Sequence, residues 1–321
     1  MFLEEFHLRL KSRKLLSLCT LLIFICSVLC GCKKEEPKKT KIVTSCYPVY
    51  IMALNLTDGL DDVEVLNMSE NHKGCLHDYK VQPDDLKNIE KSDAFIINGN
   101  GMESFLEKVT LQCPNLKIID SGKGIDVIDE DCHHHYEDEE EEEHHEHEHE
   151  HCDANPHTWV SISNYIKQVE NIRDGLISLD DKNSAKYKEN AEEYINKLSG
   201  LKSEMHSKID NVKNKNIVTF HEAFPYFAKE FGLNIVTVLN QEPETEPSAK
   251  EISETIETIK NNNVAALFVE PQYSSKIADV VSGETKVPVH TLDPAVTGEK
   301  SKDAYIQAMR KNMEVLVSVL N

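Results

Sequence analysis

A run of histidine and glutamate between Cys132 and Cys152 is the densest group of side chains in this sequence that could bind metal ions. Imidazole suits borderline divalent cations such as Zn²⁺, and the acids raise the local concentration of cations. The two cysteines could form a disulfide at the base of the run or act as extra thiolate ligands. We expect the run to bind several ions weakly through His133, His134, His135, His144, His145, His147, His149 and His151.

Four further residues stand singly, but at positions that a folded α/β chain would bring together. In open parallel sheets, ligands bind beyond the carboxyl ends of the strands. His77 lies in the loop after the second expected strand, and His157 precedes the helix that follows the fourth. His221 and Asp293 directly follow the first and last strands of the second half. Three imidazoles and a carboxylate predict a tetrahedral Zn²⁺ site, although one loop histidine taken alone is more often a surface residue.

The elements that must position these residues alternate between strands and helices. Short β-branched runs predict strands over 41–45, 63–68, 94–99 and 116–120, and again over 216–220, 234–240, 265–270 and 287–293. Helical patterns lie between and after them, over 47–60, 82–93, 102–113, 158–179, 222–232, 248–263, 274–283 and 302–320. The alternation predicts an α/β fold of two lobes, each a four-stranded, mainly parallel sheet with flanking helices.

One long rigid helix is expected to join the lobes. Its apolar residues recur at helical spacing for about thirty residues, which corresponds to about 45 Å, and they are Tyr187, Ala191, Tyr194, Leu198, Leu201, Met205 and Ile209. We therefore divide the chain into an N-terminal lobe over 41–182, a linker helix over 183–213 and a C-terminal lobe over 214–321. The charged low-complexity segment 132–152 is expected to be a disordered loop of the first lobe.

The first residues have the pattern of a targeting segment. Four basic residues precede an apolar stretch over 15–30 that is short for a membrane span. The following "LCGC" resembles a lipobox, the processing site of bacterial lipoproteins. We expect 1–31 to be a lipoprotein signal peptide, Cys32 to become the lipidated N-terminus and 32–40 to be a tether, so that the protein is extracytoplasmic and anchored to the cell membrane. The alternative is an uncleaved signal anchor.

The charge of the chain argues against binding to nucleic acid. The formal net charge is −21, and thirteen of the acids lie in and just before the histidine run. Without them the charge is about −8, which is ordinary for a soluble pair of lobes. Basic patches interleaved with aromatic residues, which nucleic-acid binding proteins use, do not occur in the sequence.

Five motifs together resemble a known family. They are "HDYKVQPDDL", "NPHTWVSISN", "FHEAFPYF", "FVEPQYSSK" and "TLDP", in this order. They are similar to motifs of the zinc-binding lipoproteins of bacterial ABC uptake systems, the ZnuA/AdcA group of metal-binding solute-binding proteins. The similarity covers nearly everything from Lys41 to the last residue. An acidic histidine-rich loop before "NPHTW" is typical of the zinc members.

The resemblance implies a function as well as a fold. It implies that His77, His157 and His221 bind the metal, and that Asp293 does so in some members only. It also implies two lobes with limited closure, a monomer, and delivery of the metal to an ABC permease and its ATPase. Manganese members carry a glutamate where this chain has His221, so Zn²⁺ is expected rather than Mn²⁺ or another divalent metal.

Two residues depart from the family motifs, and the sequence leaves three other functions open. Asn155 replaces the usual aspartate before "PH"; it could be an outer partner of His157, with a weaker orienting effect because it has no charge. Cys75 near His77 could be a ligand, could pair with Cys46 or Cys113, or could be a buried thiol. The chain could instead bind manganese, or act as an adhesin or surface metal store whose main feature is the histidine run. A zinc hydrolase is a weaker alternative, because the sequence has neither HExxH nor GxSxG. Glu222 could serve such an enzyme as a base, but capping of the next helix is the simpler role. We therefore expect a binding protein and not an enzyme.

Overall fold

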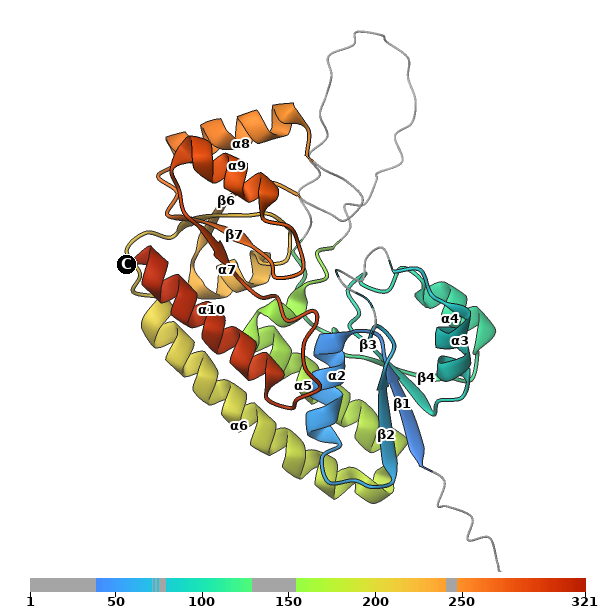
Figure 1. Ribbon diagram of the computed structural model, residues 1–321. Helices are drawn as coiled ribbons and strands as arrows, with labels where there is room; N and C mark the ends of the chain where they lie inside the picture. Colours follow the sequence, from blue (N-terminus) through green and yellow to red (C-terminus); the bar gives the residue numbers. More distant parts are fainter. Residues whose placement is uncertain (1–38, 71, 73, 75–78, 129–153, 241–246) are drawn as a thin grey trace, which may run out of the picture. The chain divides into compact units, whose positions relative to one another are not determined.

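The computed structural model describes residues 39–70, 72, 74, 79–128, 154–240 and 247–321 (Figure 1). His77, Cys75, Cys32 and the whole histidine run with Cys132 and Cys152 lie outside the described residues, so the expectations about them stay predictions. Within the described part, no helix is long and apolar enough to cross a membrane.

Two four-stranded parallel sheets of the same topology form the two lobes. The first has the strand order β2-β1-β3-β4 and the second β6-β5-β7-β8. The strands are β1 (Thr40–Thr44), β2 (Val63–Asn67), β3 (Ala94–Ile97), β4 (Lys117–Asp120), β5 (Asn216–Thr219), β6 (Asn234–Val238), β7 (Ala266–Val269) and β8 (Val289–Thr291). This confirms the predicted fold class. Each sheet has a switch point between its first and third strands, the place where α/β proteins bind ligands.

The helices follow the predicted alternation, although three of them begin three or four residues later than expected. They are α2 (Tyr47–Leu56), α3 (Pro83–Glu90), α4 (Leu106–Gln112), α5 (Ile162–Leu179), α6 (Ser184–Ile209), α7 (Pro225–Phe231), α8 (Ala249–Asn261), α9 (Lys276–Thr285) and α10 (Ala304–Leu320), with short 3₁₀ turns η2 (Thr158–Val160) and η3 (Asp181–Asn183). Helix α5 begins four residues later than expected because the Ser161 side chain accepts a hydrogen bond from the Asn164 amide and caps it. Helix α7 begins at Pro225, three residues after Glu222, so the expected capping role of Glu222 stays a prediction.

Helix α6 links the lobes, as predicted. It has 26 residues, which corresponds to about 39 Å, and its predicted apolar stripe is buried. It packs against α2 and α5 of the first lobe and against α10 of the second, as Figure 1 shows. One helix that is buried along its length against both lobes is a stiff connection between them.

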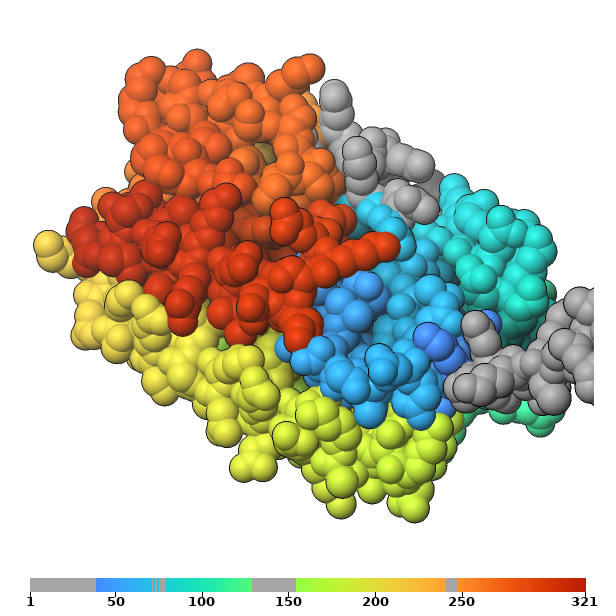
Figure 2. All heavy atoms as spheres, turned by 60° about the horizontal axis from the view of Figure 1, so that its bottom comes forward, coloured from blue at the N-terminus to red at the C-terminus, as the bar shows by residue number. Residues whose placement is uncertain are grey.

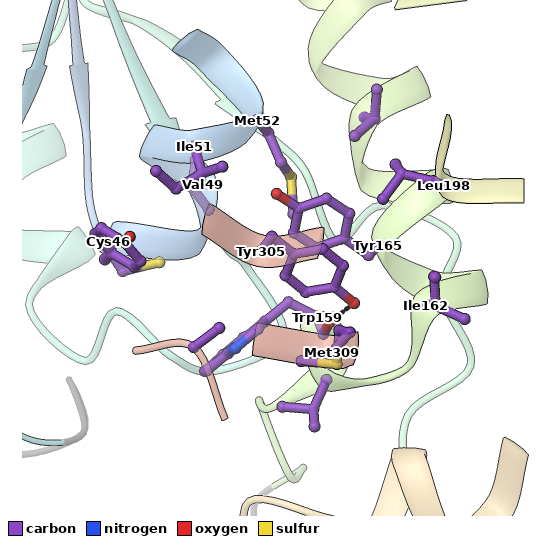
Figure 3. Close-up of a cluster of buried hydrophobic side chains, with 14 of the residues drawn as sticks. Cys46, Val49, Ile51, Met52, Trp159, Ile162, Tyr165, Leu198, Tyr305 and Met309 are labelled. Atoms are coloured by element: carbon purple, nitrogen blue, oxygen red, sulfur yellow. Dashed lines mark hydrogen bonds between the residues drawn. The ribbon is translucent and has the colours of Figure 1, made fainter. Parts of the chain in front are cut away.

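A single hydrophobic cluster continues from the first sheet through α5 and α6 to α10 (Figure 3). At its centre the ring of Tyr165 stacks on that of Tyr305, with 3.5 Å between centroids, and its hydroxyl lies 3.0 Å from that of Tyr194. The Tyr305 hydroxyl donates to the Trp159 carbonyl over 2.9 Å. A smaller cluster lies in the second lobe, between β5 and β7 of its sheet and helices α8 and α9. Because the larger core is shared, the lobes cannot separate without exposing apolar surface.

The segment between β8 and α10 adds polar contacts between the lobes. Figure 2 shows this segment, in orange-red, lying against the blue surface of the first lobe. The Tyr47 hydroxyl donates to the Glu299 carbonyl over 2.7 Å, and the Asn55 amide donates to the Lys302 carbonyl over 2.9 Å. A Cβ on Gly298 would lie 2.6 Å from the Tyr47 hydroxyl, so glycine is needed for this close approach.

Candidate metal centre

His157 is held in a buried turn just before η2. Its side chain is 0% exposed. The Asn155 side-chain oxygen accepts from the His157 backbone N–H over 3.0 Å and lies 3.1 Å from Nδ1 of the imidazole. The indole of Trp159 lies against the ring, with 5.2 Å between centroids. One amide oxygen therefore fixes both the backbone and the ring of His157.

A buried polar network supports this turn from below. The Asn98 side chain donates to the Pro156 carbonyl over 2.9 Å, and its oxygen accepts from Gln168 over 2.9 Å. The Glu103 carboxylate accepts from the backbone N–H groups of Asn98 and Gly99 over 2.7 and 3.0 Å. Burial raises the pKa of Glu103 to about 7, against the lowering effect of these hydrogen bonds.

His221 lies at the switch point of the second sheet, directly after β5. Glu270 follows β7, the neighbouring strand, so the two side chains meet at one edge of the sheet. Nδ1 of His221 lies 2.8 Å from the carboxylate of Glu270, and the side chains are only 5% and 3% exposed. The second carboxylate oxygen of Glu270 accepts from the Gln272 amide. Strand order thus places a buried acceptor behind His221.

The rings of His157 and His221 face each other across the lobes. Their centroids are 4.9 Å apart and their planes are perpendicular. Each Nδ1 faces an acceptor oxygen and is therefore the proton donor, so that Nε2 of each neutral ring is the nitrogen left to bind a metal. A carboxylate or amide behind the far nitrogen is the usual support of a metal-binding imidazole. Together the two imidazoles can supply two of the four ligands of a tetrahedral zinc site.

Asp293 is only partly buried and is fixed by its own turn. Its carboxylate accepts from the Ala295 N–H over 2.8 Å, and burial raises its pKa. Across the described residues, no three His, Cys, Asp or Glu side chains come close enough to hold a metal ion together. The structure therefore brings together His157 and His221, while His77 lies outside the described residues.

Two histidines that were expected to be structural lie in regular elements. His290 lies in β8 and His206 on α6. Glu270 belongs to the centre, but no role for it was predicted from the sequence. Its signal was the position of "FVEPQ" at the end of a strand, equivalent to that of His221 after β5. Without the strand order, nothing indicated that the two residues are neighbours.

Comparison with known proteins identifies the family. The model of the family ZnuA, described as zinc-uptake complex component A periplasmic, matches residues 42–319. The chain belongs to this family. The match extends over both lobes and the linking helix, so the predicted resemblance to the ZnuA/AdcA group is confirmed, and the family is one of transport components rather than of enzymes.

Three relatives illustrate the similarity. The high-affinity zinc uptake system protein ZnuA of Bacillus subtilis is 32% identical, over 93% of this chain and 93% of its own length. The zinc-binding protein AdcA of Streptococcus pyogenes is 32% identical over 87% of this chain. The Zn(II)-bound structure of a variant of AdcAII of Streptococcus pneumoniae superposes with a TM-score of 0.74 at 27% identity, and the match covers 89% of this chain and 100% of that one.

The lengths of these relatives differ. This chain spans 55% of the length of AdcA of Streptococcus pyogenes, but nearly the whole of the Bacillus subtilis protein. The similarity to AdcA is therefore limited to about half of that protein, and this half corresponds to both lobes of this chain.

Proposed function

We propose that this chain captures Zn²⁺ in the cleft between its lobes and delivers it to an ABC permease and its ATPase for import. The observation that carries the proposal is the pair of buried imidazoles, His157 and His221, which face each other from two lobes with a fixed acceptor behind each ring. Family membership supports the transport role. The names of the relatives support zinc as the metal.

The ligand set that we propose is His77 and His157 from the first lobe with His221 and Asp293 from the second. Nε2 is the ligand atom of His157 and His221, since Nδ1 is the proton donor in both. Imidazole at position 221 favours Zn²⁺ over the harder Mn²⁺. Asp293 would complete a tetrahedral shell, and its raised pKa would fall when the cation binds.

Glu270 should tune the affinity without touching the metal. We expect Glu270→Ala to weaken zinc binding about 10- to 100-fold, because outer partners of metal-binding histidines contribute this much. Glu270→Gln should weaken it less, since an amide oxygen can still accept from Nδ1 of His221. A competitive titration with a zinc chelator of known affinity measures both. Equal affinity of Glu270→Ala and the wild type would show that this acceptor does not support the ligand.

We propose a second, weaker role for the histidine run. His133 to His135 and His144 to His151 would collect zinc near the cleft or respond to its abundance. Alternating acids and imidazoles favour imidazolium, so binding by the run should fade on acidification. The alternative is that the run is a solvated segment with incidental affinity for metals. Only the collecting role predicts that loss of the run slows zinc uptake.

Deletion of residues 132–152 tests the two sites separately. In a competitive zinc titration of the chain from Lys33 onward, we expect one tight site to survive the deletion and the weak sites to disappear. In cells starved of zinc, the deletion should slow uptake. Loss of the tight site together with the run would make the chain a metal store, whereas unchanged uptake would remove the collecting role of the run.

The membrane anchor and the permease partner are also part of the proposed function. Cleavage before Cys32 and lipidation of this residue would hold the protein at the outer face of the cell membrane, as a monomer beside its permease. A Cys32→Ala variant should not incorporate a labelled fatty acid, whereas the unchanged chain should. Neither an adhesin nor a hydrolase is favoured by any contact among the described residues.

A further inference from the structure

All four polar groups of Asn155 form hydrogen bonds, and two of these bonds reach the segment that carries His221. Its backbone N–H donates to the Ile128 carbonyl over 2.8 Å, and its carbonyl accepts from the Tyr226 hydroxyl over 2.7 Å. Its side-chain oxygen serves His157, as described above. Its side-chain NH₂ donates to the Glu222 carbonyl over 2.7 Å. Asn155 is 1% exposed, so none of these bonds competes with bulk water.

The chemistry of the neighbours fixes the orientation of this amide. The Glu222 backbone oxygen can only accept, so the NH₂ must face it and the oxygen must face His157. A carboxylate at position 155 could still accept from the His157 ring. It could not donate to Glu222, and its second oxygen would lie against a carbonyl oxygen in a buried site. The amide therefore makes a connection that the aspartate of the family motif cannot make.

Further contacts connect the same two segments. The Tyr226 hydroxyl accepts from the Ile128 N–H over 2.9 Å while it donates to Asn155. At the start of α5, the Ser161 hydroxyl donates to the carboxylate of Glu230 on α7 over 2.6 Å. The segment that carries His157 is thus joined to the segment that carries His221 at Tyr226 and Glu230 as well as at Glu222.

We infer that Asn155 is a positioning residue that ties the His157 turn to the His221 loop and so sets the spacing of the two imidazoles before the metal arrives. The inference rests on the proposed function, because it assumes that both rings bind zinc. Ligands that are already in place lose little conformational freedom on binding. The tie should therefore slow the release of the metal more than it speeds capture.

The variants Asn155→Asp and Asn190→Asp test the inference in the full chain in detergent at one neutral pH. Asn190 is a matched control, since its buried NH₂ also donates to backbone carbonyls, those of Leu56 and Asp58, but far along α6 from both imidazoles. Zinc release is followed by mixing the zinc-loaded protein with excess chelator, and the slow phase reports the tight site. Ring ¹⁵N shifts of the metal-free protein report the tautomers of the histidines.

We expect Asn155→Asp to release zinc about 10-fold faster, with the proton still on Nδ1 of His157, and Asn190→Asp to release it at the rate of the wild type. An unchanged rate in Asn155→Asp overturns the inference, as does an equal acceleration in both variants. If Asn155→Asp does not fold, Tyr226→Phe removes the hydroxyl that joins Asn155 to Ile128, and an unchanged rate there overturns it as well. Absence of a slow phase in the wild type would instead reject the proposed function.

Discussion

His221→Ala should lower the affinity of the tight zinc site roughly a thousandfold, which is about one ligand's share of the binding free energy of a four-ligand zinc site. The imidazole is buried beside β5 and its Nδ1 lies 2.8 Å from the Glu270 carboxylate, so the truncation removes a ligand that is held in place. The weak binding by the histidine run should remain. A competitive zinc titration separates the two classes of site.

Two further variants make the result of this titration specific. His221→Gln keeps an amide that can donate to Glu270, so it removes the ligand without leaving the carboxylate unpaired in the core. His206→Gln is the control, because His206 lies on α6 with its ring against Phe231 and Asp210. If His221→Ala and His221→Gln bind zinc as tightly as His206→Gln does, the cleft is not the tight site and the histidine run takes its place.

The stability of the metal-free protein should fall as the pH rises from about 4.5 to about 7, because of Glu103. Burial raises the pKa of this carboxyl from 4.5 in the unfolded chain to about 7 in the folded protein. Between these values the folded state binds the extra proton, so protonation favours folding at low pH and this contribution is lost as the pH rises through 7. The expected loss is about 3 kcal/mol of unfolding free energy.

Glu103→Gln isolates this contribution from the titration of other groups. The variant cannot ionise at this position, so the difference in unfolding free energy between wild type and variant should be about 3 kcal/mol larger at pH 4.5 than at pH 7.5. Urea unfolding in the presence of a chelator measures it. A difference that stays constant with pH would mean that Glu103 has an ordinary pKa in the folded protein.

The same carboxylate connects stability with the metal centre. Glu103 holds the backbone of Asn98 and Gly99, and the Asn98 side chain holds the Pro156 carbonyl next to His157. A strongly buried acid is therefore retained at a position where its hydrogen bonds shape the turn that presents a ligand. The hydrogen bonds of Glu103 thus explain why an acid whose burial costs folding free energy lies outside the cleft.

The sequence alone determined the features that repeat along the chain or depend on one residue type. The β/α alternation, the apolar stripe of the linking helix and the imidazoles of His157 and His221 were all readable in this way, because periodicity and ligand chemistry are local properties. The family motifs then pointed to the same two histidines. What the sequence indicated less well was where elements begin, as with α5, whose start is set by the Ser161 cap.

Only the tertiary structure decided which side chains support the ligands. His221 meets Glu270, 49 residues later, because β5 pairs with β7 and both strands end at the same edge. Asn155 reaches Glu222, 67 residues later, because the lobes share a core that brings the two segments together. Such contacts depend on strand order and on the packing of distant elements, and neither leaves a periodic signal in the sequence. For this reason the proposed ligands could be named from the sequence, while the contact of Glu270 with His221 and that of Asn155 with Glu222 required the fold.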